Sequence, residues 1–287
     1  RIEAYLAAID NRQRHSRITA TAGVLYDSNV NAGPDTDTVE LFGLPFRLSD
    51  DSRESSDWAA TATVNVGYQR PLNDTVALDG GFRLDYRDYR DIDDFDSLEG
   101  SAWLGPAWRV GRASVAIPLV ASAIRLGHDA DYYQRAIGIA PRVTYAIDRQ
   151  WAVTARTVAQ DVHYHDNEAA DGELGRVDAS LSYRPTSSWQ LGVGVYASRE
   201  DSGLDTRSHT RRGARVSLNG VITPVWRISA SLDHAFLKYD DSGAFFVRDR
   251  KAHRSHVNTS VTRRFPSSGL DLVLDLSYTR NDSSLGL

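Results

Sequence analysis

Cysteine and methionine are both absent from this chain of 287 residues. Without cysteine there is no disulfide, no thiolate metal ligand and no cysteine nucleophile. A translated protein starts with methionine, whereas this sequence starts at Arg1. We therefore expect a processed or trimmed chain from which a leader or an upstream region has been removed.

Long apolar runs and a basic stripe are missing as well. No stretch approaches the run of about 20 apolar residues that a membrane-spanning helix needs, so any membrane crossing must use strands. The net charge of -5 is spread over the whole length, without the clustered Lys and Arg of a nucleic-acid-binding surface. We therefore expect no nucleic-acid partner. The length suits one large all-β domain or two ordinary domains.

The first residues carry the only helical period in the sequence. Ile2, Tyr5, Leu6 and Ile9 recur at helical spacing within residues 1–14. This spacing predicts one short amphipathic N-terminal helix.

Period-2 segments recur from there to the end. In residues 57–71, Trp58, Val64 and Tyr68 share one parity with alanines, whereas the other parity is small and polar, with residues such as Thr61 and Asn65. This alternation predicts strands with one apolar face and one polar face. The predicted strands lie at residues 17–27, 57–71, 75–87, 97–109, 113–126, 132–147, 151–164, 176–184, from 189, around 215–221, and at 226–236, 253–264 and 270–279.

The connections between these thirteen segments alternate in length. Short turns follow the even-numbered segments, and longer polar loops such as 28–56 and 239–251 follow the odd-numbered ones. Short turns at one end and long loops at the other are typical of an antiparallel up-and-down outer-membrane β-barrel. Such bacterial barrels have an even number of strands. We therefore predict fourteen strands in the full protein, with residues 15–287 forming a transmembrane barrel that lacks its last strand.

Aromatic residues on the apolar parity gather at both ends of the predicted strands. Such girdles are favoured at the two interfaces of a membrane, where amphipathic rings are stable. The girdle beside the short turns is predicted to contain Tyr68, Trp108, Tyr145, Trp151, Tyr183, Trp189 and Trp226, and the girdle beside the long loops Tyr26, Trp58, Tyr86, Phe236 and Tyr278. The lipid of the outer membrane is thus an expected partner.

Charges of both signs occupy the opposite parity. The predicted lumen-facing set is Arg17, Asp79, Arg83, Asp85, Arg87, Glu99, Arg176, Asp178, Arg215, Arg227, Asp233, Asp271 and Asp275. We expect these residues to form ion pairs that hold the strand register and the barrel shape. A selective ion pathway is the less favoured interpretation, because neither sign dominates.

Signals for catalysis or a cofactor are weak. The pairs His163 with His165 and His253 with His256 have side chains that suit zinc or copper, but exposed histidines are the more economical explanation. The acidic loops lack the pattern of a calcium-binding loop. Phe245, Phe246 and Val247 form an apolar patch that fits either a contact site or a plug. We expect no catalytic residue, no bound metal and no cofactor.

The helix and the first strand, which run into Tyr26, Asp27, Ser28, Asn29, Val30 and Asn31, resemble the start of the barrel in the surface lipoprotein assembly modifier family. This family is also discussed as the outer-membrane component of type XI secretion. The resemblance implies that residues 1–14 end a removed periplasmic region of tetratricopeptide-like repeats. It also implies an export role for specific lipoproteins or soluble secreted proteins, and no catalytic residue.

The sequence therefore predicts a protein of the bacterial outer membrane, with a periplasmic N-terminus and extracellular long loops, that exports lipoproteins or secreted proteins or displays them at the surface. The expected partner besides lipid is that exported protein. We expect transport through or beside the lumen, with the seam between the first and the closing strand as a working surface. A passive porin or polysaccharide-export channel, and a soluble β-rich binding module, are the alternatives.

Overall fold

The computed structural model describes residues 15–34, 36, 38–41, 44–49, 52–127, 131–165, 167–243 and 249–284. The predicted helix over residues 1–14 and the apolar stretch at 245–247 lie outside these residues. Strands dominate the described part, with two short 3-10 segments, η2 (Asp93–Phe95) and η3 (Glu168–Ala170), in the loops. In this part, no helix is both long and apolar enough to cross a membrane.

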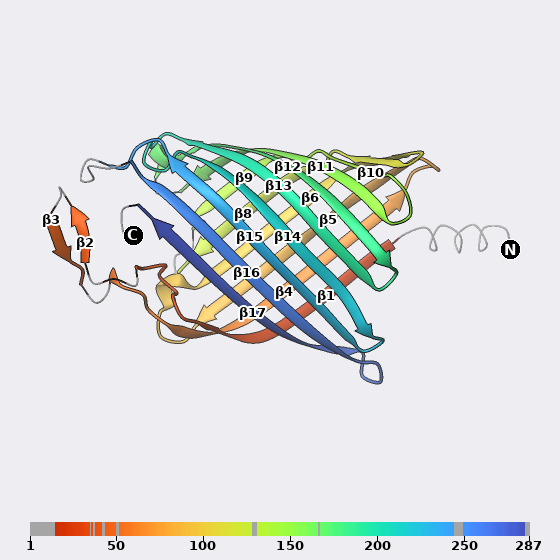
Figure 1. The fold of residues 1–287 in the computed structure, drawn as a ribbon, viewed down its shortest axis with the longest axis horizontal. Coiled ribbons are helices and arrows are strands. Elements are labelled where there is room, and N and C mark those ends of the chain that lie inside the picture. Colours follow the sequence, from red (N-terminus) through yellow and green to blue (C-terminus); the bar gives the residue numbers. More distant parts are fainter. Residues whose placement is uncertain are drawn as a thin grey trace.

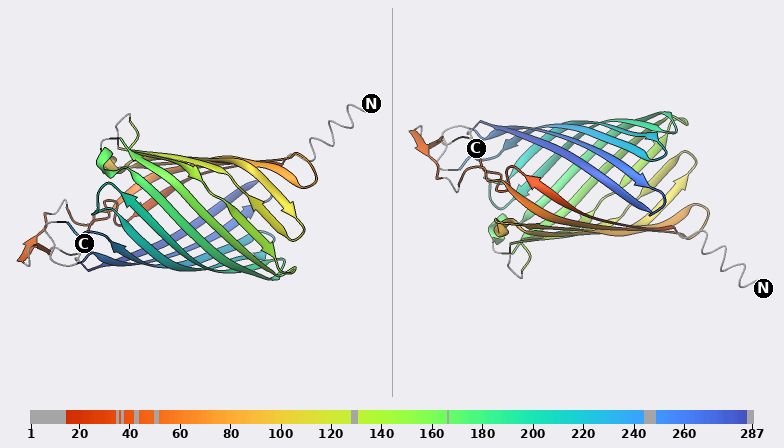
Figure 2. Two further views of the ribbon diagram at one scale, coloured as in Figure 1. Left: turned by 90° about the horizontal axis from the view of Figure 1, so that it is seen from above. Right: turned by 90° about the horizontal axis from the view of Figure 1, so that it is seen from below.

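The strands run back and forth along a tilted, curved sheet (Figures 1 and 2). They are β1 (His15–Asp27), β2 (Thr38–Leu41), β3 (Leu44–Arg47), β4 (Asp57–Pro71), β5 (Val76–Tyr89), β6 (Ser97–Val110), β7 (Ala113–Ala116), β8 (Leu119–Leu126), β9 (Gln134–Ile139), β10 (Arg142–Ala146), β11 (Trp151–Tyr164), β12 (Gly172–Thr186), β13 (Trp189–Ser202), β14 (His209–Thr223), β15 (Trp226–Tyr239), β16 (Lys251–Phe265) and β17 (Leu270–Ser283).

Each strand of the large sheet pairs with its neighbours in an antiparallel, up-and-down order from β1 to β17. The small hairpin of β2 and β3 lies outside this sheet, within the long loop 28–56, and extends beyond the long-loop end (Figure 1). Among the described residues, no pairing joins β1 to β17, so these two strands are the edges of the sheet. The fold is the predicted all-β transmembrane barrel.

Connections alternate in length as predicted. The short turns are closed by side chains that accept backbone hydrogen bonds. The Asn73 Oδ1 atom accepts the N–H groups of Thr75 and Val76 at 2.9 and 2.8 Å. Asp148 Oδ1 accepts those of Gln150 and Trp151 in the same way, at 2.7 and 2.8 Å. Such self-closed turns need no other part of the protein, which suits a barrel rim.

Two predicted strands are not continuous. The segment expected at 113–126 is divided into β7 and β8, and the segment expected at 132–147 into β9 and β10. Each division falls at a proline, Pro118 or Pro141. A proline has no backbone N–H, so it removes one hydrogen bond from the ladder although the side-chain alternation continues through it.

The apolar side chains of the described residues do not fill a shared core. On β17, Leu270, Leu274 and Tyr278 are 67, 62 and 64% exposed. In the part of the chain that the structure describes, buried residues form only small clusters, for example Tyr196 with Ala235, Leu237 and Ala252. This distribution is typical of a barrel that presents its apolar face to lipid.

Candidate functional site: the inner wall and the two rims

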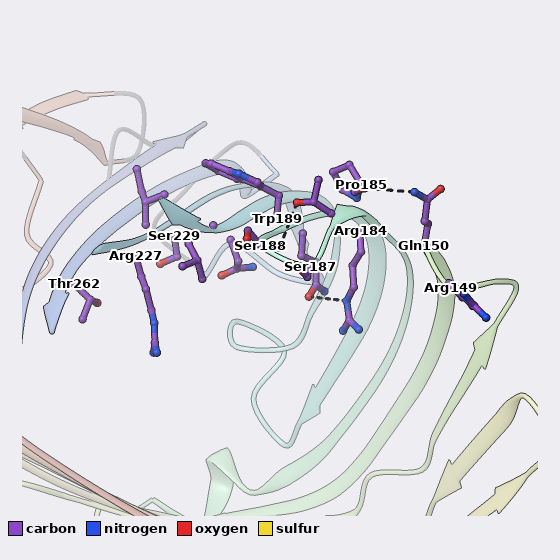
Figure 3. A pocket seen from close by; sticks show the side chains of 16 residues that line it. Arg149, Gln150, Arg184, Pro185, Ser187, Ser188, Trp189, Arg227, Ser229 and Thr262 are labelled. Atoms are coloured by element: carbon purple, nitrogen blue, oxygen red, sulfur yellow. Dashed lines mark hydrogen bonds between the residues drawn. The ribbon is translucent and has the colours of Figure 1, made fainter. Parts of the chain in front are cut away.

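The inner wall is the concave face of the curved sheet. In Figure 3, Arg184 on β12 and Arg227 on β15 project to the concave side, whereas Trp189 on β13 lies on the other side of the sheet. Residues that pair directly across neighbouring strands share a face. Arg227 on β15 is paired with Val221 on β14 and Thr262 on β16, so all three residues lie on the concave face. Following the cross-strand partners from strand to strand in this way assigns a face to the residues of the whole sheet.

The register places the thirteen predicted lumen-facing charges on this concave face. They are Arg17, Asp79, Arg83, Asp85, Arg87, Glu99, Arg176, Asp178, Arg215, Arg227, Asp233, Asp271 and Asp275. That this face is in contact with water is still a prediction.

Three pairs of these charges meet. Arg83 and Asp85 are two residues apart on β5, and Arg83 donates from Nε and Nη2 to the two carboxylate oxygens of Asp85. Arg176 and Asp178 repeat that spacing on β12, with Nη2 2.6 Å from Oδ1. The third pair joins two strands.

Asp233 on β15 is the centre of that third, denser group. It accepts hydrogen bonds from Arg215 Nε at 3.1 Å and Arg211 Nη2 at 3.4 Å, and from the Tyr196 hydroxyl at 2.7 Å. Asp233 is 6% exposed, and the three donors satisfy its buried charge. The group therefore ties β13, β14 and β15 together on the inner wall.

Sequence reasoning missed Tyr196, because it assigned aromatic residues to the lipid face. Two guanidinium groups lie near the Tyr196 ring, with Arg176 Cζ 4.2 Å and Arg211 Cζ 5.4 Å from the ring centroid. Its cross-strand partner is Gly213, where an added Cβ would lie 2.4 Å from Tyr196 Cζ. The glycine makes room for the ring.

Trp103 on β6 is a second inward aromatic residue that was missed. It pairs with Gly81, where a Cβ would lie 2.5 Å from the indole ring and 2.2 Å from the Val66 carbonyl oxygen. A bulky ring over a cross-strand glycine is thus used twice on the inner wall. The signal is visible only once the strand register is known.

Other predicted charges are not paired with one another. Within the described residues, no hydrogen bond or salt bridge joins Arg17, Asp79, Glu99, Arg227, Asp271 or Asp275 to another member of the set. Arg87 Nη1 instead donates to the Tyr89 hydroxyl at 3.1 Å. Asp79 and Glu99 line a cavity of about 430 Å³, together with Arg142 and Arg156. Both signs of charge therefore face this cavity.

The twelve predicted interface aromatics lie on the face opposite the charges. They are Tyr26, Trp58, Tyr68, Tyr86, Trp108, Tyr145, Trp151, Tyr183, Trp189, Trp226, Phe236 and Tyr278. Some form cross-strand ring pairs near the strand ends. Tyr26 and Trp58 have centroids 5.1 Å apart, and Trp151 stacks on Tyr183 at 4.3 Å. Their contact with lipid is still a prediction.

The motif that follows Tyr26 closes the base of the long loop 28–56. Asn31 Nδ2 donates to the Arg53 carbonyl at 2.6 Å, and Asn31 Oδ1 accepts the N–H of Ser55 at 3.1 Å. The N–H of Val30 donates to the Ser55 carbonyl at 2.7 Å. These bonds hold the two ends of the loop side by side.

The rest of the motif supports this clamp. Asn29 Nδ2 donates to the Gly33 carbonyl at 2.8 Å, and Asp27 accepts the Tyr89 hydroxyl at 3.2 Å. Ser28 lies in the bend directly after β1. The Tyr26 to Asn31 stretch therefore has a structural role at the long-loop rim.

Carboxylates hold other long loops in place. Asp57 is 4% exposed and accepts the N–H groups of Asp91 and Ile92 at 2.8 and 3.0 Å. Asp171, just before β12, accepts the N–H of Tyr164 at 2.7 Å and hydrogen-bonds with His163 Nδ1 at 2.9 Å. These two hydrogen bonds lower the pKa of Asp171 below its ordinary value.

The structure gives the members of each histidine pair different surroundings. His253 lies on the convex face beside Phe236, whereas His256 lies on the concave face and bonds Thr279 Oγ1 at 2.8 Å. His163 is engaged by Asp171, and His165 lies 3.4 Å from Asp131. In the described part of the chain, no group of three or more His, Asp or Glu side chains is placed to hold a metal ion.

The sequence model of the surface lipoprotein assembly modifier family matches residues 17–287, which is nearly the whole chain. The chain belongs to this family. The resemblance read from Tyr26 to Asn31 is thereby confirmed, and the protein is a β-barrel of the bacterial outer membrane with a role in surface lipoprotein assembly. No curated protein matches the chain significantly.

Several solved structures are similar to this chain. A NanC porin has 9% identity and a TM-score of 0.43, covering 93% of this chain and 99% of its own. A loop-deleted OmpT from Vibrio cholerae has 12% identity and a TM-score of 0.45, covering 94% of each chain. A Pseudomonas aeruginosa FadL homologue has 11% identity and a TM-score of 0.46, covering 95% and 82%. Likenesses this weak say nothing about function.

Proposed function

We propose that this barrel exports specific lipoproteins or soluble secreted proteins across the outer membrane, or displays them on the cell surface. The observation that carries the proposal is the family match over residues 17–287, which extends from β1 through β17 and leaves out only the first two residues of β1. The exported protein is its partner, besides outer-membrane lipid. We place the short turns in the periplasm and the long loops outside the cell, as in other barrels of this kind.

The lateral edge is the proposed working surface. The inner wall carries Trp103, Tyr196 and ion-paired side chains, which narrow the lumen. A folded polypeptide is too wide for a lumen of about fourteen strands filled in this way. β1 and β17 are the two edges of the described sheet, and a predicted closing strand would complete the wall between them. Substrate then passes at the junction of β1 with that strand.

A disulfide lock tests this route. A cysteine in place of Thr21, near the middle of β1, is paired with a cysteine at the facing position of the closing strand in the full-length protein. Residues 1–287 contain no cysteine, so no native thiol among them can form a competing disulfide with the introduced cysteines. The readout is protease accessibility of a co-expressed lipoprotein on intact cells. We expect surface exposure to be lost when the lock is oxidised and regained on reduction. Unchanged exposure with a fully formed lock contradicts the lateral route.

A passive channel is the second candidate, and the two cavities on the concave wall, each lined by both charged and apolar residues, favour it. A steady single-channel conductance in planar bilayers, without any protein partner, supports a porin or a polysaccharide-export channel. Surface display that depends on the barrel supports export instead.

A further inference from the structure

The short-turn end of the inner wall contains the larger of the two described cavities, about 850 Å³. Arg149, Arg184 and Arg227 are among its lining residues. Figure 3 shows Arg184 and Arg227 extending from separate strands toward the same space. The rest of the lining is largely hydroxyl and amide groups, including those of Ser229 and Asn219.

No carboxylate is among the lining residues, all of which are described. Of the neighbouring acids, Asp148 closes its own turn, and Asp271 lies opposite Arg264 in the strand register rather than in the lining of this cavity. Arg184 Nε donates only to the Gln190 amide oxygen, at 3.3 Å. For Arg149 and Arg227, the described residues provide no hydrogen bond and no salt bridge to the side chain.

This arrangement differs from the rest of the wall. Arg83, Arg176 and Arg215 each have an aspartate partner within the barrel. If the arginines of the cavity served only to hold the register, the same kind of partner would be expected beside them. Arg184 and Arg227, two cations that face one space without a carboxylate partner, instead form a site for negative charge.

We propose that this cavity binds oxyanions, either carboxylate or phosphate. Guanidinium groups bind both in a bidentate manner, and the surrounding hydroxyl and amide groups supply further donors. The oxyanion belongs either to a free solute or to an acidic stretch of polypeptide, since both have the same charge and geometry. The inference does not depend on the proposed export role.

The test is isothermal titration of the full-length protein in detergent micelles with inorganic phosphate and with hexaglutamate. The variant is Arg184→Gln with Arg227→Gln. The control is Arg70→Gln with Arg263→Gln, which removes the same charge from the same end but on the convex face. We expect binding of at least one probe to weaken about tenfold or more in the variant, as for the loss of a charged hydrogen bond, and to stay within about twofold in the control.

The probe that binds identifies the source of the oxyanion. Binding of neither probe, or equal binding by the variant and the wild type, overturns the proposal. If the variant does not fold, the site is tested in the wild-type protein instead, by measuring how a bound probe protects arginines from modification by phenylglyoxal. A bound probe should protect Arg184 and Arg227 but not Arg70 and Arg263, and equal protection of all four contradicts the site.

Discussion

Single glycines decide where large side chains fit on the inner wall. A Cβ at Gly213 would lie 2.4 Å from Tyr196 Cζ and 2.8 Å from the His234 carbonyl oxygen, whereas at Gly67 nothing lies within 4 Å. Both positions are on the concave face. A side chain would therefore clash at Gly213 but not at Gly67, and the sequence alone does not distinguish the two glycines.

Gly213→Ala is expected to destabilise the barrel by about 1–3 kcal/mol, because the added methyl group displaces the Tyr196 ring and disturbs its hydrogen bond to Asp233. Gly67→Ala, the matched control, should change stability by less than about 0.5 kcal/mol. Urea unfolding in lipid vesicles, followed by heat-modified gel mobility, measures both. Equal effects of the two substitutions would refute the packing role of Gly213.

At the scale of the element, a row of prolines interrupts the ladder on neighbouring strands. The N–H groups of Ile117, Ala140 and Thr157 donate to the carbonyls of Pro106, Pro118 and Pro141 at 3.1, 3.0 and 2.9 Å. The reciprocal bond of each pair is missing, because proline has no N–H. Within the described sheet, this part of the wall is therefore held more weakly than the strand pairs with both bonds.

Hydrogen exchange tests this weakness. Pro118→Ala restores a donor facing the Ala140 carbonyl, and a hydrogen bond of about 1 kcal/mol should slow exchange of the Ala140 amide roughly fivefold. Pro71→Ala, at the end of β4 beside a short turn, is the control and should leave Ala140 unchanged. If Pro118→Ala leaves the exchange rate of the Ala140 amide unchanged, the missing hydrogen bonds at the prolines do not weaken this part of the wall.

The loop before β12 should respond to acid in one direction. Because the hydrogen bonds from Tyr164 and His163 lower the pKa of Asp171, their stabilisation is complete above its ordinary value of 3.8 and is lost as the pH falls through the lower folded value. Pepsin cleavage within residues 165–171 should rise sharply below that pH. Asp171→Asn should remove this pH step, whereas Asp205→Asn in the next long loop should keep it. If the pH step in cleavage persists in Asp171→Asn, another titratable group causes it.

Sequence periodicity predicted the strands and turns well, because the side-chain alternation and turn chemistry are local. It did not predict the division at Pro118 or the hairpin of β2 and β3. In the first case the alternation continues through the proline, and in the second the loop composition hides two short strands. The inward positions of Trp103 and Tyr196 depend on cross-strand glycines, which only the register reveals.

At the scale of the whole molecule, the two faces of one continuous sheet differ in chemistry. The concave face carries charges, amides and hydroxyls, and the convex face carries aliphatic residues with aromatic residues toward the strand ends. Membrane insertion, the lateral route and the oxyanion site all depend on this difference. A strand shifted by one residue would exchange the faces, so the register is strongly specified.

Spin labels on β13 test this arrangement most directly. Single cysteines are placed at residues 190 to 195, one per variant, labelled and measured by electron paramagnetic resonance in lipid vesicles. We expect labels at Leu191, Val193 and Val195 to collide with dissolved oxygen and those at Gln190, Gly192 and Gly194 with a water-soluble nickel complex. Nickel access on both parities, or access to neither reagent at residues 191, 193 and 195, would contradict a lipid-facing convex side.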